Sequence, residues 1–257
     1  WEMGTVVVAT SNRLPSELYE GGLNRSYFMP FVDQLERHCI VHTMKSGMDY
    51  RVALTDSSLD HFFLHSRETS HSEFGKLVGQ LREGGPSTVV SLNVGRNREL
   101  LVEHGDDTGR LAHFSFEELC DTELGASDYR ALSQHFDILA IENIPLLSLE
   151  DPNRARRFVT LIDELYETKS TALLCRADQA SPFDLFQGRQ VVQANKEVAP
   201  EDAPPALGID QAEKNGLPLG ALASIRELSF AFERAASRIT EMTSRRWWDL
   251  VLENPKS

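Results

Sequence analysis

The chain has 257 residues and a formal net charge of −13, with 41% hydrophobic and 25% charged residues. This is the balance of a globular protein with one large or two modest domains. The negative charge argues against a surface that coats nucleic acid, because neutralising phosphates requires clustered Lys and Arg. No apolar run approaches the roughly 18–20 residues of a membrane span.

Three cysteines, Cys39, Cys120 and Cys175, lie far apart in the sequence and form no CxxC pair. A sparse, odd set of this kind predicts reduced thiols in an intracellular compartment. Each cysteine is expected to pack as a small apolar residue.

The N-terminal region predicts a strand–helix–strand unit. Residues 5–10 read TVVVAT, a β-favouring run without alternation that predicts a strand buried on both faces, as in a parallel sheet. A short helix at 16–20, a longer helix at 24–37 and a second strand at 39–44 follow. A buried strand needs neighbours, which preceding sequence would normally supply, so the chain is expected to be truncated.

The middle of the chain changes character twice. After a polar stretch at 47–85, three short strands at 88–94, 99–103 and 111–116 predict a small antiparallel β-meander. Alternating helices and strands then indicate a return to α/β organisation: helix 128–134, strand 138–141, a helix opened by Asp151 and Pro152, and strand 171–175.

The last third begins with a segment of low complexity. Residues 189–223 hold four prolines among Glu, Asp, Ala and Gly, which predicts a disordered insertion. A helix at 225–248 follows, and it ends in Trp247 and Trp248. These two residues could form an interfacial anchor, although burial of one and exposure of the other is the favoured interpretation.

A polar amide follows the first strand. Asn12 would lie at the carboxyl edge of a parallel sheet, where α/β proteins bind ligands. In AAA+ ATPases the residue at this place is sensor 1, which orients the attacking water, and an amide can donate and accept hydrogen bonds at once. A plain turn residue is the alternative.

An arginine stands 13 residues further on, at a Gly-rich corner between two helices. The guanidinium of Arg25 is always charged and forked, so it could reach a neighbouring subunit's triphosphate as an arginine finger. The alternative is a surface arginine at a helix corner.

Three blocks in the same order carry a family resemblance: VVVATSNRLPSELYEGGLNRSYFMPFVDQLERHC with SGMDYR, then FSFEELCDTELGASDYRALSQHFDILAIENIPLL with RARRFVTLIDELYE, then FAFERAASRITEM. Together they resemble the ZapE-like, or AFG-one-like, family of AAA+ P-loop ATPases. That family includes a bacterial division-associated ATPase and mitochondrial members linked to turnover or assembly of inner-membrane proteins.

The resemblance implies an α/β fold: the C-terminal part of a P-loop AAA+ parallel-sheet core, then a mixed α+β lid region with the small β-meander. It implies four segments. The end of the nucleotide-binding core spans 1–46, and a mixed α/β region with the meander at 87–116 spans 47–188. The insertion spans 189–223, and the C-terminal helix spans 224–257.

The resemblance also implies roles for particular residues. Asn12 matches sensor 1 and Arg25 the arginine finger, the two expected catalytic residues. Four further arginines are candidates for sensor 2 contacts to the phosphates of ATP, with ion pairing or partner contacts as the alternative: Arg156, Arg157, Arg234 and Arg238.

The nucleotide-binding motifs themselves do not occur in this sequence. Walker A reads GxxxxGK[ST], but the Gly75-Lys76 pair is followed by leucine, and Ser70 stands where the first glycine belongs. Ile141-Glu142-Asn143 is a poor Walker B, placed after sensor 1. ATP and Mg²⁺ are therefore expected only in a full-length protein, and this chain alone is expected to be inactive.

Two further interpretations complete the sequence-based picture. His61 and His65, with His71 beyond, have helical spacing for zinc, but no Glu or Cys completes the set, so no metal site is predicted.

The alternative to an ATPase portion is a non-catalytic adaptor that has lost its P-loop. From the resemblance we expect a homo-oligomeric ring acting as a chaperone or quality-control motor on membrane-protein or protease-associated clients. We expect a mitochondrial location in a eukaryote, a cytoplasmic one in a bacterium, and no nucleic-acid partner.

Overall fold

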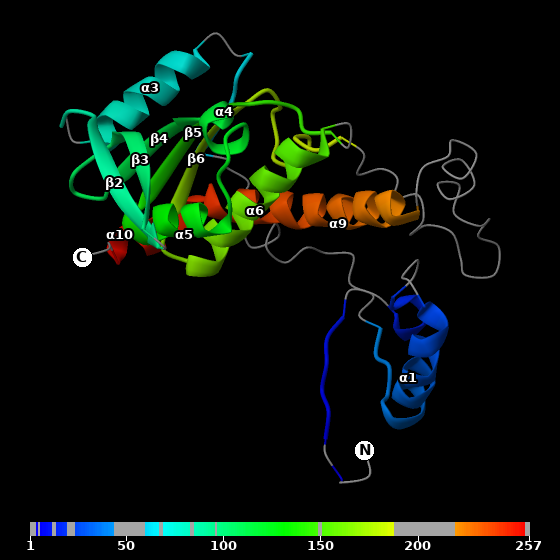
Figure 1. Cartoon of the computed structure of the whole chain (residues 1–257). Helices are drawn as coiled ribbons and strands as arrows, with labels where there is room; N and C mark the ends of the chain where they lie inside the picture. Colours follow the sequence, from blue (N-terminus) through cyan, green and yellow to red (C-terminus); the bar gives the residue numbers. More distant parts are fainter. Residues whose placement is uncertain are drawn as a thin grey trace. The chain divides into compact units, whose positions relative to one another are not determined.

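A computed structural model describes residues 4, 6–11, 14–19, 24–43, 60–66, 69–82, 85–95, 97–148, 151–187 and 219–254, with the backbone alone for 219–227 and 229. The chain divides into two compact units: Trp1–Gly47 with Pro204–Arg226, and Met48–Ala203 with Glu227–Ser257 (Figure 1).

The first unit contains the two predicted helices. η1 (Pro15–Glu17) is a single 3₁₀ turn, and α1 (Arg25–His38) is a full α-helix. The Phe28 ring lies with its centroid 5.4 Å from those of Tyr19 and Phe31, so a small aromatic cluster joins the loop after η1 to α1.

Neither predicted strand of this unit is found. Residues 6–11 and 40–43 lie outside any strand, and Val6, Val8 and Ile40 are 87%, 90% and 99% exposed. A strand needs a neighbour for its backbone hydrogen bonds and covering layers for its apolar side chains. Within the described part of this unit the regular structure is helical, and no strand is available to pair with these segments. The prediction of strands at 5–10 and 39–44 is therefore wrong for the described residues, 6–10 and 39–43.

The second unit is built on a parallel sheet of four strands in the order β1-β6-β5-β4. These strands are β1 (Phe62–Leu64), β4 (Leu111–Ser115), β5 (Ile138–Ile144) and β6 (Ala172–Ala177). Every residue of β6 and the first four of β5 are buried, as expected for strands covered on both faces. The α/β fold class is confirmed, and the parallel sheet is consistent with a P-loop ATPase-like core.

Helices connect and cover the strands. α3 (Ser70–Leu81) follows β1, α4 (Phe116–Cys120) and α5 (Ala126–His135) join β4 to β5, and α6 (Pro152–Thr168) joins β5 to β6. α5 and α6 pack side by side (Figure 1). The Asp151 side chain accepts a hydrogen bond from the Arg154 amide, which confirms the predicted start of α6. No strand was predicted in the polar stretch at 47–85, so the sequence interpretation missed β1.

The predicted meander has two strands rather than three. β2 (Thr88–Gly95) and β3 (Arg98–Gly105) form an antiparallel pair, but β4 pairs in parallel with β5. The reason lies in burial. β2 is largely exposed on alternate residues, whereas Leu111, Ala112 and Phe114 of β4 are buried on both faces, which an exposed ribbon cannot provide.

The predicted C-terminal helix is two helices, α9 (Leu219–Met242) and α10 (Arg245–Glu253). Ser244 separates them because its hydroxyl accepts from the Trp247 amide and caps α10. Trp247 and Trp248 are both buried, and their indole N–H groups donate to the carbonyls of Thr171 and Leu173. The expectation that one of the two is exposed is wrong.

The predicted insertion falls mostly outside the described residues. Its part at 219–223 is helical, as the start of α9, so the insertion ends earlier than predicted. Within the described part of the chain, no helix is both long and apolar enough to cross a membrane.

One histidine packs against α10 and makes stability depend on pH. The His61 ring stacks on Trp248 with centroids 3.7 Å apart, and its Nδ1 lies 3.0 Å from the Thr243 carbonyl. Burial lowers the pKa of His61 below its ordinary 6.5, against an opposing effect of the Thr243 hydrogen bond.

The folded chain binds a proton at His61 less readily than the unfolded chain does. The free energy of unfolding should therefore be unaffected by this histidine above pH 6.5 and should fall as pH drops below it. We expect the urea midpoint to fall more between pH 7.5 and 5.5 for the wild type than for His61→Phe, which keeps a ring against Trp248. An NMR titration should give His61 a pKa below 6.5. Equal pH slopes in the two proteins would contradict this assignment.

Candidate functional site

The predicted arginine finger stands at the first residue of α1. Asn24, just before it, has a left-handed backbone (φ 60°), which turns the chain into the helix. The Arg25 guanidinium donates to the carbonyl of Ser16 in η1. The Nε of Arg25 is buried without a hydrogen-bond partner among the described residues. Asn12 lies outside the described residues, so its role as sensor 1 stays a prediction.

The first pair of candidate sensor 2 arginines lies on α6. Arg157 donates to the Cys120 carbonyl across 3.1 Å, which joins α6 to the end of α4. Its neighbour Arg156 is exposed on the same helix.

The second pair lies on α9 and is engaged with α6. Arg234 and Arg238 both donate to the Asp163 carboxylate, with an Arg234 Nη2 to Oδ2 distance of 2.6 Å. Arg238 also reaches Glu167 at 3.1 Å and lies over the Tyr166 ring at 4.6 Å. In this structure both arginines link α9 to α6 through carboxylates of α6, and the Arg238 Nε is buried without a hydrogen-bond partner among the described residues.

A polar network that was not predicted lies at the carboxyl edge of the sheet. Arg176, near the end of β6, has only 6% of its side chain exposed. Its Nη2 donates to Glu142 Oε2 (2.9 Å) and Asn143 Oδ1 (2.7 Å), and its Nη1 lies 2.7 Å from His65 Nδ1. A buried guanidinium is tolerated only with such partners. The network therefore links the ends of β1, β5 and β6.

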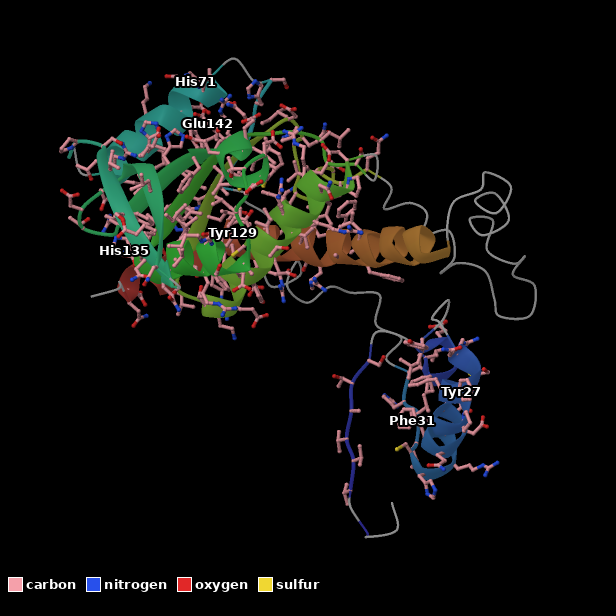
Figure 2. All side chains as sticks on the ribbon, viewed as in Figure 1. Tyr27, Phe31, His71, Tyr129, His135 and Glu142 are labelled. Atoms are coloured by element: carbon pink, nitrogen blue, oxygen red, sulfur yellow. The ribbon has the colours of Figure 1, made fainter. Side chains whose placement is uncertain are left out.

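An irregularity in β5 makes these contacts possible. The β5–β6 register shifts between Ile141 and Ile144, and Asn143 has a left-handed backbone (φ 58°). Such an irregularity re-aims side chains at a strand end. Figure 2 shows Glu142 at the end of the sheet near α3, and Tyr129 and His135 toward the other end.

The network continues to β4 and opens on a recess. His113 Nε2 lies 3.2 Å from Glu142 Oε1, so Glu142 is held between an arginine and a histidine. Burial lowers the pKa of His113, although Glu142 opposes the effect. A recess of about 480 Å³ is lined by His104, His113, Phe114, Ser115, Glu118 and Glu142. Recesses at this edge of an α/β sheet are where such folds bind ligands.

The zinc interpretation of His61 and His65 does not fit the structure. His61 stacks on Trp248, whereas His65 contacts Arg176. The two rings therefore contact different partners, His61 just before β1 and His65 just after it.

A sequence signal for the network existed. Two buried apolar strands each end in charged or polar residues, Glu142-Asn143 and Arg176, and parallel strands present such ends at one edge. The two ends become partners only because β5 pairs with β6, and the sequence alone did not predict that pairing.

The comparisons with known proteins agree on one family. A model of the family described as AFG1-like ATPase matches residues 1–195. The chain is 34% identical to Lactation elevated protein 1 homolog B of Danio rerio over 96% of this chain and 48% of that protein. It is 29% identical to Uncharacterized protein C115.02c of Schizosaccharomyces pombe over 95% of this chain and 51% of that protein.

A bacterial relative extends the likeness. Cell division protein ZapE of Escherichia coli K12 is 33% identical over 72% of this chain and 48% of its own length. The chain thus spans about half the length of the curated relatives it matches. No solved structure matches the chain. The chain belongs to the AFG1-like ATPase family.

Proposed function

We propose that this chain is the C-terminal portion of an AAA+ ATPase in which Asn12 acts as sensor 1 and Arg25 as an arginine finger. The observation that carries the proposal is the family match over residues 1–195, which includes both residues. The exposed apolar run at Val6–Val8 agrees with it, because a sheet contributed by further sequence would bury those side chains.

The candidate arginines differ in how well each could bind an anionic nucleotide. Arg25 donates to the Ser16 carbonyl, and within the described part of the chain no carboxylate pairs with its guanidinium. Arg234 and Arg238 instead face Asp163, which already supplies the negative charge. Arg25 therefore fits a triphosphate better than the α9 arginines do.

Within the proposal each residue has a limited task. Bound Mg²⁺-ATP supplies the phosphoryl group and the charge that develops during its transfer. Asn12 would hold a water by donating and accepting hydrogen bonds in its own subunit. Arg25 would place a fixed positive charge at the site of a neighbouring subunit. This division of tasks requires a homo-oligomer.

The cellular role is proposed from the family resemblance alone. A motor that acts on proteins at a membrane, mitochondrial in a eukaryote and cytoplasmic in a bacterium, fits a family with both eukaryotic and bacterial members. The adaptor alternative rests on the sequence lacking GxxxxGK[ST].

Calorimetric titration separates these ideas. The chain alone should give no saturable heat with millimolar Mg²⁺-ATP, because backbone amides and a lysine of a P-loop are needed to hold the phosphates. A longer product of the same gene that includes a P-loop should bind. Micromolar binding by the chain alone would overturn the proposal, and a gene that encodes no P-loop would favour the adaptor.

A further inference from the structure

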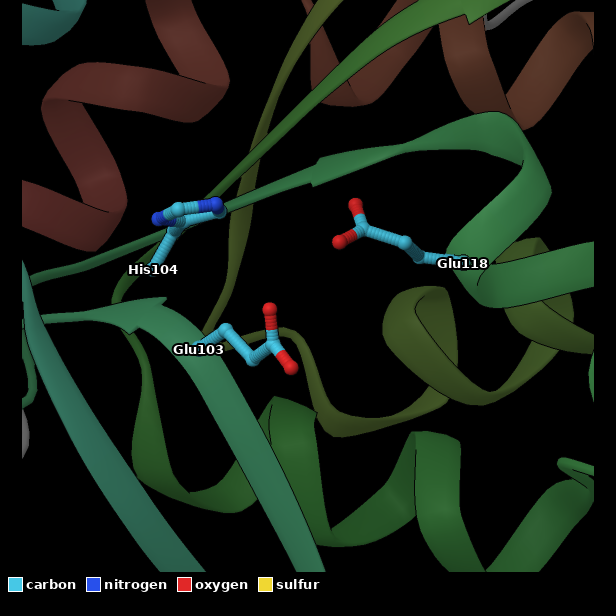
Figure 3. A group of neighbouring side chains, drawn as sticks. All are labelled: Glu103, His104 and Glu118. Carbon is cyan, nitrogen blue, oxygen red and sulfur yellow. The ribbon is translucent and has the colours of Figure 1, made fainter.

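Three side chains outside the predicted sites bring metal-binding atoms together. Ligand atoms of Glu103 and His104 on β3 and of Glu118 on α4 all lie within 4.8 Å of one another (Figure 3). Within the described residues this is the one group of three or more acidic, histidine or cysteine side chains that could hold an ion.

A bulge in β3 explains how two consecutive residues contribute. Consecutive strand residues normally point to opposite faces. Thr88 pairs with Gly105 and Val90 with Val102, so Glu103 and His104 together oppose the single residue Val89. A β-bulge of this kind re-aims side chains and is frequent beside functional sites. The bulge is a feature of the backbone, independent of the charges.

His104 and Glu118 each use one polar atom to contact a neighbouring residue. His104 Nδ1 lies 3.4 Å from Ser87 Oγ, which leaves Nε2 as its ligand atom. Glu118 Oε2 accepts from the Ser115 amide at 2.6 Å within the capping box of α4, which leaves Oε1 for a ligand. Partners of this kind orient metal ligands and fix the histidine tautomer.

The surroundings suit a cation. His104 and Glu118 also line the recess of about 480 Å³, which gives an ion access to solvent and room for water ligands. Arg82 donates to the His104 carbonyl at 2.7 Å, so its positive charge lies beside the site. The guanidinium of Arg176 is bound to Glu142. The Arg176 charge is thus paired, whereas a carbonyl does not neutralise Arg82. The carboxylates of Glu103 and Glu118 supply the negative charge that balances a divalent ion.

We propose that Glu103, His104 and Glu118 bind a first-row transition-metal dication of the Zn²⁺ class. One imidazole and two carboxylates are a ligand set for such ions, and hard Mg²⁺ would not need the imidazole. Zinc ligands at 2.0–2.2 Å in tetrahedral geometry lie about 3.4 Å apart, so rotation of the exposed Glu103 side chain closes the remaining gap. Three protein ligands leave a fourth position for water. This site is independent of the proposed ATPase site.

Metal titration of the chelator-treated full chain tests the proposal. We expect one equivalent of Co²⁺ to give the visible absorption of a tetrahedral N/O site, and Zn²⁺ to displace it with micromolar affinity. Glu103→Gln and His104→Gln should each weaken Zn²⁺ binding by at least about 10-fold.

Matched controls separate this site from surface binding. Glu117→Gln on the same helix and His71→Gln on α3, both exposed, should bind Zn²⁺ as the wild type does. Circular dichroism checks that each variant remains folded. The proposal is overturned if the wild type shows no stoichiometric binding, if Glu103→Gln and His104→Gln bind normally, or if Mg²⁺ competes equally with Zn²⁺.

Discussion

In an assembly that hydrolyses ATP, Arg25→Ala and Asn12→Ala should each lower turnover by about 30- to 1000-fold and change nucleotide affinity little. The expected loss corresponds to about 2–4 kcal/mol of transition-state stabilisation, the magnitude found for other preorganised donors. Affinity is spared because neither residue belongs to a P-loop, which holds most of the phosphate contacts. Steady-state hydrolysis and nucleotide titration of the longer P-loop-containing protein measure the two quantities.

A control on the same helix makes the result specific. Arg37 is exposed in the last turn of α1, and Arg37→Ala removes the same charge from the same element. Turnover of this variant should stay near the wild-type value. An Arg25→Ala protein as active as Arg37→Ala would leave Arg25 as a residue that only joins α1 to η1 through Ser16.

Breaking the carboxyl-edge network should cost about 3 kcal/mol of unfolding free energy. Arg176→Met fills similar space but leaves Glu142, Asn143 and His65 without their donor. Removing one partner of a buried ion pair is strongly destabilising because the other charge stays uncompensated. Urea denaturation of the full chain followed by circular dichroism measures the loss.

Two further variants identify the cause of that loss. Glu142→Gln in the Arg176→Met background should recover part of the stability, since the stranded charge is removed. Arg130→Met breaks a pair with Glu164 in which the arginine is 59% exposed, and it should cost less than about 1 kcal/mol. Equal losses for Arg176→Met and Arg130→Met would show that the network is no more than a surface ion pair.

Local signals were sufficient for the elements that the sequence did predict. α6 begins where Asp151 and Pro152 place it, and its apolar face of Ala155, Phe158 and Ile162 is buried. α1 and α5 likewise follow their helical spacing of apolar residues. Each of these depends on neighbours three or four positions apart, which a sequence displays directly.

The errors occurred where a distant partner decides the outcome. Val6 and Val8 have the composition of buried strand residues but no covering layer among the described residues. β4 follows a hairpin in the sequence, yet it pairs with β5 because its residues are buried on both faces. Strand composition therefore predicted an extended conformation without predicting what pairs with it.

The unpredicted site residues have the same physical origin. Glu103 and His104 read as ordinary residues of an exposed strand until the bulge opposite Val89 turns them together. Glu118 reads as a capping residue and is one. Arg176 gains its partners from two other segments of the chain, which only the folded sheet brings within hydrogen-bonding distance.

Mixing subunits tests the central claim most directly. Arg25→Ala subunits should keep intact nucleotide sites, so adding subunits that lack the P-loop lysine but retain Arg25 should restore part of the hydrolysis. Asn12→Ala subunits should gain nothing from the same mixture, because sensor 1 acts within its own subunit. If mixed assemblies form and Arg25→Ala is not rescued, Arg25 does not act on a neighbouring subunit, and the proposed division of tasks is contradicted.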